Sequence, residues 1–442
     1  MTKNMTTGSV AKNILYFSLP YFFSYFLQTL YGMADLFIIG QFEGAASITA
    51  VSIGSQVMHM LTVMIVGLAM GTTVTIAQAV GAEDGLRVRK AIGTTAVLFF
   101  VVSIVLAIVL IVLRGSITGV METPFEAASG TQAYLLICFL GIPLITAYNI
   151  IASIFRGLGD AKSPMYFVAV ACLCNIALDY LFMGALSMGP AGAAWGTVIS
   201  QAISVVLALA YVKSGRAGIL LSRQDFRPDL AVLRRILRIG VPISLQDGFI
   251  QVAFLVITVI ANMRGLTDAA AVGIVEKVIS FIFLVPSSML STVSALGAQN
   301  IGAGKVGRAQ QTLRYALAMA VSFGIVVSIV TQYTADGIVG LFTYDAAVIV
   351  AGGAYLQGYI FAGIHFCFSG YFCACGRSEI SFLHNVVSIV TARIPLVYLT
   401  SIWYPDTLFP MGLATATGSV VSVIICIGAF ALLRARGRAA FC

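Results

Sequence analysis

The sequence predicts an all-α polytopic membrane protein with twelve transmembrane helices in two six-helix bundles. Three observations support this fold class. Hydrophobic residues make up 60% of the 442 residues and charged residues only 10%, whereas about 25% of a soluble domain is charged. The mean hydropathy is +1.00 over the whole chain, so no sizeable water-soluble domain is expected. An internal repeat relates the second half of the chain to the first.

Apolar runs long enough to cross roughly 30 Å of hydrocarbon predict the helices in chain order. The first run contains Pro20 and is followed by no small-residue cleavage site, so it is expected to remain as the first helix. Residues 1–212 form the predicted N-terminal lobe, 213–238 a cytoplasmic linker and 239–442 the C-terminal lobe. The predicted spans are 14–40, 48–80, 91–113, 131–155, 164–186, 190–212, 239–263, 269–297, 315–335, 346–372, 380–403 and 409–433.

Three matching segments define the repeat. Residues 14–20 recur as 236–242, residues 77–82 recur as 298–303, and the pattern that ends at Thr197 recurs as the one that ends at Thr417. Because six is an even number, both halves enter the membrane in the same direction, which predicts a pseudo-twofold axis along the membrane normal. Such duplicated bundles enclose a central cavity and rock for alternating access.

The positions of the basic residues predict the orientation. With both termini in the cytoplasm, 21 of the 25 Lys and Arg residues lie in cytoplasmic segments, as the positive-inside rule requires. The net charge of +8 therefore reflects topology, and no nucleic-acid partner is expected. We expect a multi-pass protein of the cell (plasma) membrane, the inner membrane of a double-membraned bacterium.

Catalytic and ATP-binding motifs are missing from the sequence. Lys162-Ser163 lacks the glycines of a phosphate-binding loop, and no GxSxG motif occurs. The three histidines, His59, His365 and His384, are scattered over three spans. We therefore expect no enzyme, no catalytic residue, no metal centre and no cofactor, which leaves secondary transport as the main function class.

Ionisable residues inside the spans are the candidates for function. A charge at the middle of the membrane costs about 2.5–3.5 kcal/mol on the insertion scale, so such residues usually face a cavity. Asp35 follows Pro20 by fifteen residues in the first span, and a proline bend there offers a helix hinge. The complete set is Asp35, Asp179, Asp247, Glu276, Lys277 and Arg393.

Asn175, Asp179 and Thr197 extend the candidate site around Asp35. Asn175 and Asp179 are four residues apart and share one helix face, and Thr197 adds a hydroxyl group. Oxygen ligands of this kind suit Na⁺, whereas two neighbouring buried carboxyl groups suit a bound proton. A third interpretation is that both aspartates only form hydrogen bonds with neighbouring helices.

These residues resemble the multidrug and toxic compound extrusion (MATE) family, and its DinF-like branch in particular. The resemblance covers nearly the whole chain: the spacing from Pro20 to Asp35, Asn175-x3-Asp179, the glycine-rich segment that ends at Thr197, and the repeated Ala-Gln-x-x-Gly-Ala loop. It implies a MATE-like fold and a cation-coupling network in the N-terminal lobe that takes H⁺ or Na⁺. That network consists of Asp35, Asn175, Asp179 and Thr197 with Tyr134, and a bound Na⁺ would lie at Asp35 and Asp179.

The sequence departs from the NorM-like branch, which has acidic residues in helices 7 and 10 of the C-terminal lobe. Ile250 and Gln251 lie near that position in the seventh span, and the tenth span has no acid. Asp247 and Glu276 either line the substrate cavity or pair with Lys277 or Arg393. The predicted cavity residues are Asn149, Gln246, Asp247, Gln251, Glu276, Met58, Phe283 and Tyr359.

The function that the resemblance implies is secondary active efflux of amphipathic, often cationic compounds, including xenobiotics, by H⁺ or Na⁺ antiport. The alternative is a flippase for a lipid-linked saccharide or a lipid-like metabolite. A flippase cavity should be basic, but the spans hold only Lys277 and Arg393 against four acids. The expected partners are small-molecule substrates and membrane lipids, and the protein is expected to be a monomer.

Overall fold

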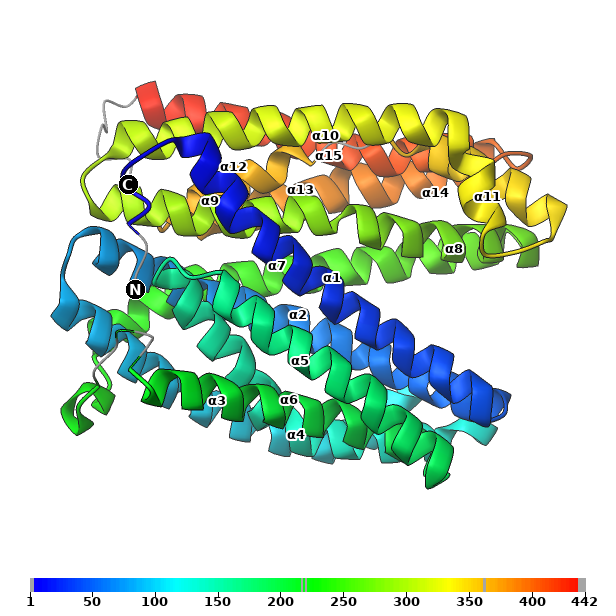
Figure 1. The fold of residues 1–442 in the computed structure, drawn as a ribbon. Helices are drawn as coiled ribbons and strands as arrows, with labels where there is room; N and C mark the ends of the chain where they lie inside the picture. Colours follow the sequence, from blue (N-terminus) through cyan, green and yellow to red (C-terminus); the bar gives the residue numbers. More distant parts are fainter. Residues whose placement is uncertain (1–3, 216–217, 219–220, 361–362, 436–442) are drawn as a thin grey trace. The chain divides into compact units, whose positions relative to one another are not determined.

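The computed structural model describes residues 4–215, 218, 221–360 and 363–435, and every regular element within these ranges is a helix (Figure 1). Eleven of the helices or helix pairs in these ranges are long and apolar enough to cross a membrane. The shorter α11 and α12 together occupy the tenth predicted span. The predicted all-helical membrane fold is therefore confirmed.

Six long helices form the first half of the chain. Five of them each contain one predicted span, and the remaining span, 164–186, is shared by α5 and the π-helix that follows it. These five extend beyond the apolar runs because the helices continue past the hydrocarbon core. At its C-terminal end α5 passes directly into a π-helix, η1. The bounds are α1 Val10–Phe42, α2 Ala45–Gly81, α3 Gly85–Val120, α4 Phe125–Gly157, α5 Lys162–Asp179, η1 Tyr180–Ala185 and α6 Gly189–Lys213.

The second half repeats this order with more interruptions. A short 3-10 helix, η2, precedes α7, which begins inside the segment that the sequence assigns to the linker. The bounds are η2 Arg223–Phe226, α7 Leu230–Met263, α8 Leu266–Ile282, α9 Leu284–Gly302, α10 Val306–Gly340, α11 Ala346–Gly358, α12 Ile364–Ala374, α13 Ser378–Ser388, η3 Ile389–Arg393, α14 Ile394–Trp403 and α15 Phe409–Ala435.

The expectation of one continuous helix over 346–372 is wrong. Helix α11 ends at Gly358, and the backbone leaves the helical conformation at Tyr359, where ψ is 81°. A Cβ atom on Gly358 would overlap the carbonyl oxygen of Phe409, so α15 passes directly against the end of α11. Hydropathy could not reveal this interruption because the residues on both sides of it are apolar.

The chain divides into two compact units that exchange the beginnings of their first helices. The first unit contains Met1–Met5 and Tyr16–Ser244, and the second contains Thr6–Leu15 and Leu245–Cys442. Helix α1 therefore begins in the second unit and continues in the first. In the same way α7 begins in the first unit and continues in the second.

Basic residues after the second helix of each half hold these exchanged segments. In the second unit, Lys305 Nζ donates a hydrogen bond to the carbonyl oxygen of Thr6 at 3.0 Å. Arg308 Nη2 donates to the carbonyl oxygens of Thr7 and Gly8, each at 2.8 Å. In the first unit, Lys90 Nζ lies 3.5 Å from a carboxylate oxygen of Asp229, just before α7.

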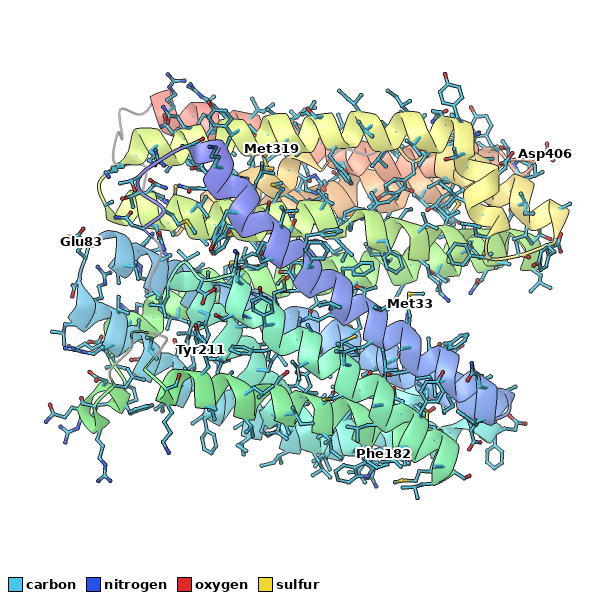
Figure 2. The ribbon with its side chains drawn as sticks, in the orientation of Figure 1. Met33, Glu83, Phe182, Tyr211, Met319 and Asp406 are labelled. Carbon is cyan, nitrogen blue, oxygen red and sulfur yellow. The ribbon has the colours of Figure 1, made fainter. Side chains whose placement is uncertain are left out.

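Helices α2 and α4 form the interior of the first unit, whereas α3 lies on its outside. In the most apolar stretches of α2 and α4, 61% of the residues are buried, compared with 22% in α3. The outer face of α3 exposes a stripe of apolar side chains that suits contact with lipid. Figure 2 shows side chains that project from the helices in this view. The stripe contains Phe100, Val101, Val105, Ile108 and Val112.

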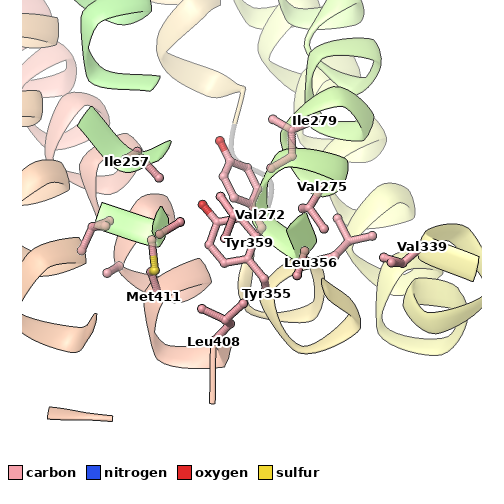
Figure 3. Packing of buried hydrophobic residues seen from close by; sticks show 14 of the residues in the cluster. Ile257, Val272, Val275, Ile279, Val339, Tyr355, Leu356, Tyr359, Leu408 and Met411 are labelled. Atoms are coloured by element: carbon pink, nitrogen blue, oxygen red, sulfur yellow. The ribbon is translucent and has the colours of Figure 1, made fainter. Parts of the chain in front are cut away.

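The second unit has an apolar core to which α7, α8, α10, α11, α14 and α15 contribute buried residues (Figure 3). These helices are far apart in the sequence, so the core fixes their relative positions within the unit. The members drawn and labelled in Figure 3 include Ile257, Val272, Val275, Ile279, Tyr355, Leu356, Tyr359 and Met411.

Candidate functional site

Asp35 is a buried carboxyl group in the C-terminal part of α1, only 2% exposed. The hydroxyl group of Thr197 on α6 donates a hydrogen bond to its Oδ2 atom at 3.3 Å. The other carboxylate oxygen, Oδ1, is buried and has no hydrogen-bond partner. One of the two oxygens of this carboxyl group therefore remains open for a proton or a cation.

Asn175 and Asp179 on α5 adjoin Asp35, and both are fully buried. Both carboxylate oxygens of Asp179 and both polar amide atoms of Asn175 lack hydrogen-bond partners. Burial of so many unpaired polar atoms is costly unless a ligand satisfies them. The structure thus brings together four of the five residues of the predicted coupling site on three helices, with most of their oxygens unsatisfied.

The backbone next to the site has two special features. The π-helix η1 begins at the residue after Asp179, and π-helical turns occur frequently at functional sites. On α6, a Cβ atom on Gly196 would overlap Asp179 Oδ1 and lie 3.6 Å from Asn175 Nδ2. Gly196 therefore allows the carboxyl group to lie directly against α6.

Two tyrosines, one from α4 and one from α1, also lie near Asp35. Tyr134 is buried at 2% exposure and interacts electrostatically with Asp35. Its ring lies directly against Gly54 on α2, where a Cβ atom would overlap the ring. Tyr31 also interacts electrostatically with Asp35, and sequence reasoning missed it. Its position one turn before Asp35 on the same helix is the signal that could have found it.

Pro20 lies within a helix that continues on both sides of it. Proline has no N–H to donate to the carbonyl group one turn earlier, which weakens the helix locally. The hydroxyl group of Ser24 donates a hydrogen bond to the carbonyl oxygen of Pro20 at 2.8 Å. The structure therefore provides a weakened turn at the predicted hinge, and movement there stays a prediction.

The eight predicted cavity residues are divided between the two units. In the first unit, the side chain of Asn149 donates to the carbonyl oxygen of Ile145, and Met58 is part of the apolar core. In the second unit, buried Gln246 accepts a hydrogen bond from the hydroxyl group of Ser381 at 2.7 Å. The others in that unit are Asp247, Gln251, Glu276, Phe283 and Tyr359. A common cavity for all eight stays a prediction.

A sequence profile of the MatE family matches residues 20–181 and 242–399, which is more than half of the chain. The chain belongs to the MatE family. The family identifies this protein as a transporter rather than an enzyme, and the predicted resemblance to MATE proteins is confirmed. With its apolar helices, the protein is a multi-pass membrane transporter.

Curated relatives of this MATE transporter carry names from drug export. The probable multidrug resistance protein YpnP of Bacillus subtilis is 28% identical over 405 residues, which cover 90% of each chain. The probable multidrug resistance protein NorM of Thermotoga maritima is 24% identical, over 88% of this chain and 85% of the relative. The multidrug export protein MepA of Staphylococcus aureus is 24% identical over 84% of this chain and 83% of the relative.

Solved structures show the same fold. A MATE protein crystallised in complex with MaL6 aligns with a TM-score of 0.89 and 22% identity, and the alignment covers 97% of both chains. An outward-facing multidrug resistance MATE transporter aligns with the same score, identity and coverage. The fold of these transporters has twelve transmembrane helices, in agreement with the number that the sequence predicts.

Proposed function

We propose that this MATE transporter exports amphipathic, often cationic compounds from the cell in exchange for H⁺ or Na⁺ by alternating access. The observation that carries the proposal is the group of buried, unsatisfied oxygens of Asp35, Asp179 and Asn175. The export names of the curated relatives support the choice of substrate. Both termini in the cytoplasm, location in the plasma membrane and a monomeric state are parts of the same proposal.

The site can couple ion binding to movement of the helices that form it. Two adjoining buried carboxyl groups repel each other when both are ionised, and a proton or a cation relieves that repulsion. Binding draws the oxygens of α1, α5 and α6 together, whereas release lets them separate. Pro20 gives α1 a weakened turn through which such a change can bend the helix.

The exchange of one cation for another lowers the free energy that the ion gradient must supply for export. A hundredfold substrate gradient requires about 2.7 kcal/mol. Expelling a monovalent cation against 100 mV requires about 2.3 kcal/mol more. If one H⁺ or Na⁺ enters for each monovalent cation that leaves, no net charge moves. The ion gradient then drives export without work against the membrane potential.

Ethidium export from proteoliposomes tests the proposal, with a pH gradient and a Na⁺ gradient imposed separately. We expect the wild type to follow one of the two gradients and Asp35→Asn to lose that response while it still binds ethidium. Asp406→Asn, which removes an exposed carboxylate far along the chain, is the matched control and should export normally. Export by a folded Asp35→Asn variant that still follows the gradient would contradict coupling at this site. Export under neither gradient by the wild type would favour a flippase.

A further inference from the structure

The second unit contains a partly buried acid and a partly buried base that the proposed coupling site does not use. Glu276 lies on α8, and Arg393 is the last residue of η3. Glu276 Oε2 accepts a hydrogen bond from the hydroxyl group of Thr258 at 3.1 Å. Glu276 Oε1 and the Nε and Nη2 atoms of Arg393 are buried and have no hydrogen-bond partner. No hydrogen bond therefore joins the two charges to each other.

The unpaired atoms of Arg393 form one edge of its guanidinium group. The N–H bonds of Nε and Nη2 point in the same direction and make the parallel pair of donors that a carboxylate accepts with both oxygens. One flat face of the group is covered, because its central carbon lies 4.6 Å from the centre of the Phe254 ring. The edge formed by Nε and Nη2 is thus the part of the group that has unused donors for a ligand.

The backbone around Glu276 and Arg393 is irregular on two sides. Arg393 ends the π-helix η3, and α11 stops at Gly358 beside the same residues. Tyr355 and Tyr359, at this end of α11, lie side by side (Figure 3) and each interacts electrostatically with both Glu276 and Arg393. Interrupted helices and π-turns mark binding sites in transporters.

The repeat relates one residue of this cluster, Tyr355, to the coupling site of the first half. Tyr355 follows Tyr134 by 221 residues, the same offset that relates the two Ala-Gln-x-x-Gly-Ala loops. Tyr134 lies by Asp35 in the first unit, and Tyr355 lies by Glu276 in the second. At the same offset the counterpart of Asp35 is Val256, and that of Glu276 is Ser55. The two halves therefore share the tyrosine, whereas the acid and the base beside Tyr355 are found in the second half.

We propose that Glu276 and Arg393 form a binding site for a zwitterionic amphipathic compound. Its carboxylate binds the Nε and Nη2 edge of Arg393, its cationic group lies by Glu276 Oε1, and its apolar body contacts the neighbouring aromatic rings. This inference rests on the proposed export function. It specifies that the exported compounds include cations that also carry a carboxylate. A site that binds only cations would not need the paired donors of this guanidinium group.

Two dyes that differ at one group test the site. Rhodamine 110 has a free carboxylate, and rhodamine 123 is its methyl ester with the same rings. We measure binding of each dye by fluorescence anisotropy to the full-length protein in nanodiscs. Arg393→Gln should weaken binding of rhodamine 110 at least tenfold and that of rhodamine 123 less than threefold, because only the acid uses the paired donors. Glu276→Gln should weaken binding of both dyes.

Lys277→Gln is the matched control, because it removes an exposed positive charge next to Glu276 on the same helix. It should change neither affinity. Arg393→Lys keeps the charge but not the paired donors. Its affinity for rhodamine 110 should therefore lie between those of the wild type and Arg393→Gln. This smaller change also tests the site if Arg393→Gln fails to fold. The double variant Glu276→Gln/Arg393→Gln should bind rhodamine 110 at least as weakly as Arg393→Gln.

Several results would overturn the inference. An equal loss of both dyes in Arg393→Gln, or recovery of wild-type affinity in the double variant, would identify Glu276 and Arg393 as an internal charge pair. Wild-type binding of rhodamine 123 without rhodamine 110 would reject this site and leave the proposed function in place. Binding of neither dye would contradict the proposed export of amphipathic cations, and the site with it.

Discussion

Gly196 shapes the coupling site although it contributes no polar side-chain atom. Because an added Cβ atom would overlap Asp179 Oδ1, Gly196→Ala should displace the carboxyl group from its place against α6. We expect ethidium export to fall at least tenfold, which corresponds to about 1.4 kcal/mol. Gly428→Ala is the control, since nothing lies within 4 Å of a Cβ atom at that glycine. Normal export by Gly196→Ala would show that the close approach is not required.

The carboxyl group of Asp225, in η2 outside the membrane spans, should make the stability of the folded protein depend on pH. Hydrogen bonds from the backbone N–H and the hydroxyl group of Ser222, at 2.7 Å and 2.9 Å, hold the pKa of Asp225 below its ordinary value, and Arg89 adds to the effect. A lowered pKa stabilises the folded state above the unfolded value of about 3.9, and this stabilisation is lost as the pH falls through the folded value.

The test compares melting temperatures of the wild type and Asp225→Asn between pH 7 and pH 3. The variant should melt lower at neutral pH, and the difference should shrink below about pH 4, where the wild-type carboxylate becomes protonated. Asp406→Asn, in an exposed loop, serves as the control and should follow the wild type throughout. A difference that is constant over the whole range would mean that the charge of Asp225 is not the cause.

The residues of the coupling site were partly predictable from spacing. The interval of four between Asn175 and Asp179 places both on one face of α5, and the structure brings them to Asp35. Thr197 was predicted from a motif, and it does reach Asp35. The role of Gly196 could not be predicted, because it depends on how closely α5 approaches α6 rather than on any local pattern.

At the scale of elements, α2 and α7 cross with their backbones in direct contact inside the first unit. A Cβ atom on Gly71 would overlap the carbonyl oxygen of Ile236, and one on Gly240 would overlap that of Leu68. Backbone atoms cannot rotate away as side chains do, so Gly71→Ala and Gly240→Ala should each cost about 1–3 kcal/mol. The two losses should not add, because both open the same contact.

Thermal unfolding of the single and double variants measures this effect, and Gly337→Ala on α10 provides the control because nothing lies within 4 Å of its added Cβ. Additive losses would indicate two independent contacts. The sequence repeats glycine at many helix positions, so the pattern alone could not indicate which pair of glycines meets. Hydropathy predicted the spans themselves but not the break after Gly358, because the residues on both sides of the break are apolar.

At the scale of the whole molecule, the distribution of Lys and Arg predicts which loops face the cytoplasm. Glu83, after α2, belongs to a predicted cytoplasmic loop, and Asp406, before α15, to an external one (Figure 2). In a background without the eight native cysteines, a membrane-impermeant maleimide added to intact cells should label Asp406→Cys and leave Glu83→Cys unlabelled until the cells are broken. The reverse pattern would invert the proposed topology.

The exchange of first-helix segments between the units has a consequence for the origin of this chain. An ancestral protein with a single copy of the six helices would have had to give the start of its first helix to a second, identical copy, as in a domain-swapped dimer. Fusion of two such copies into one chain would turn an exchange between subunits into an exchange within one chain. The hydrogen bonds from Lys305 to Thr6 and from Arg308 to Thr7 would be what remains of that old subunit exchange.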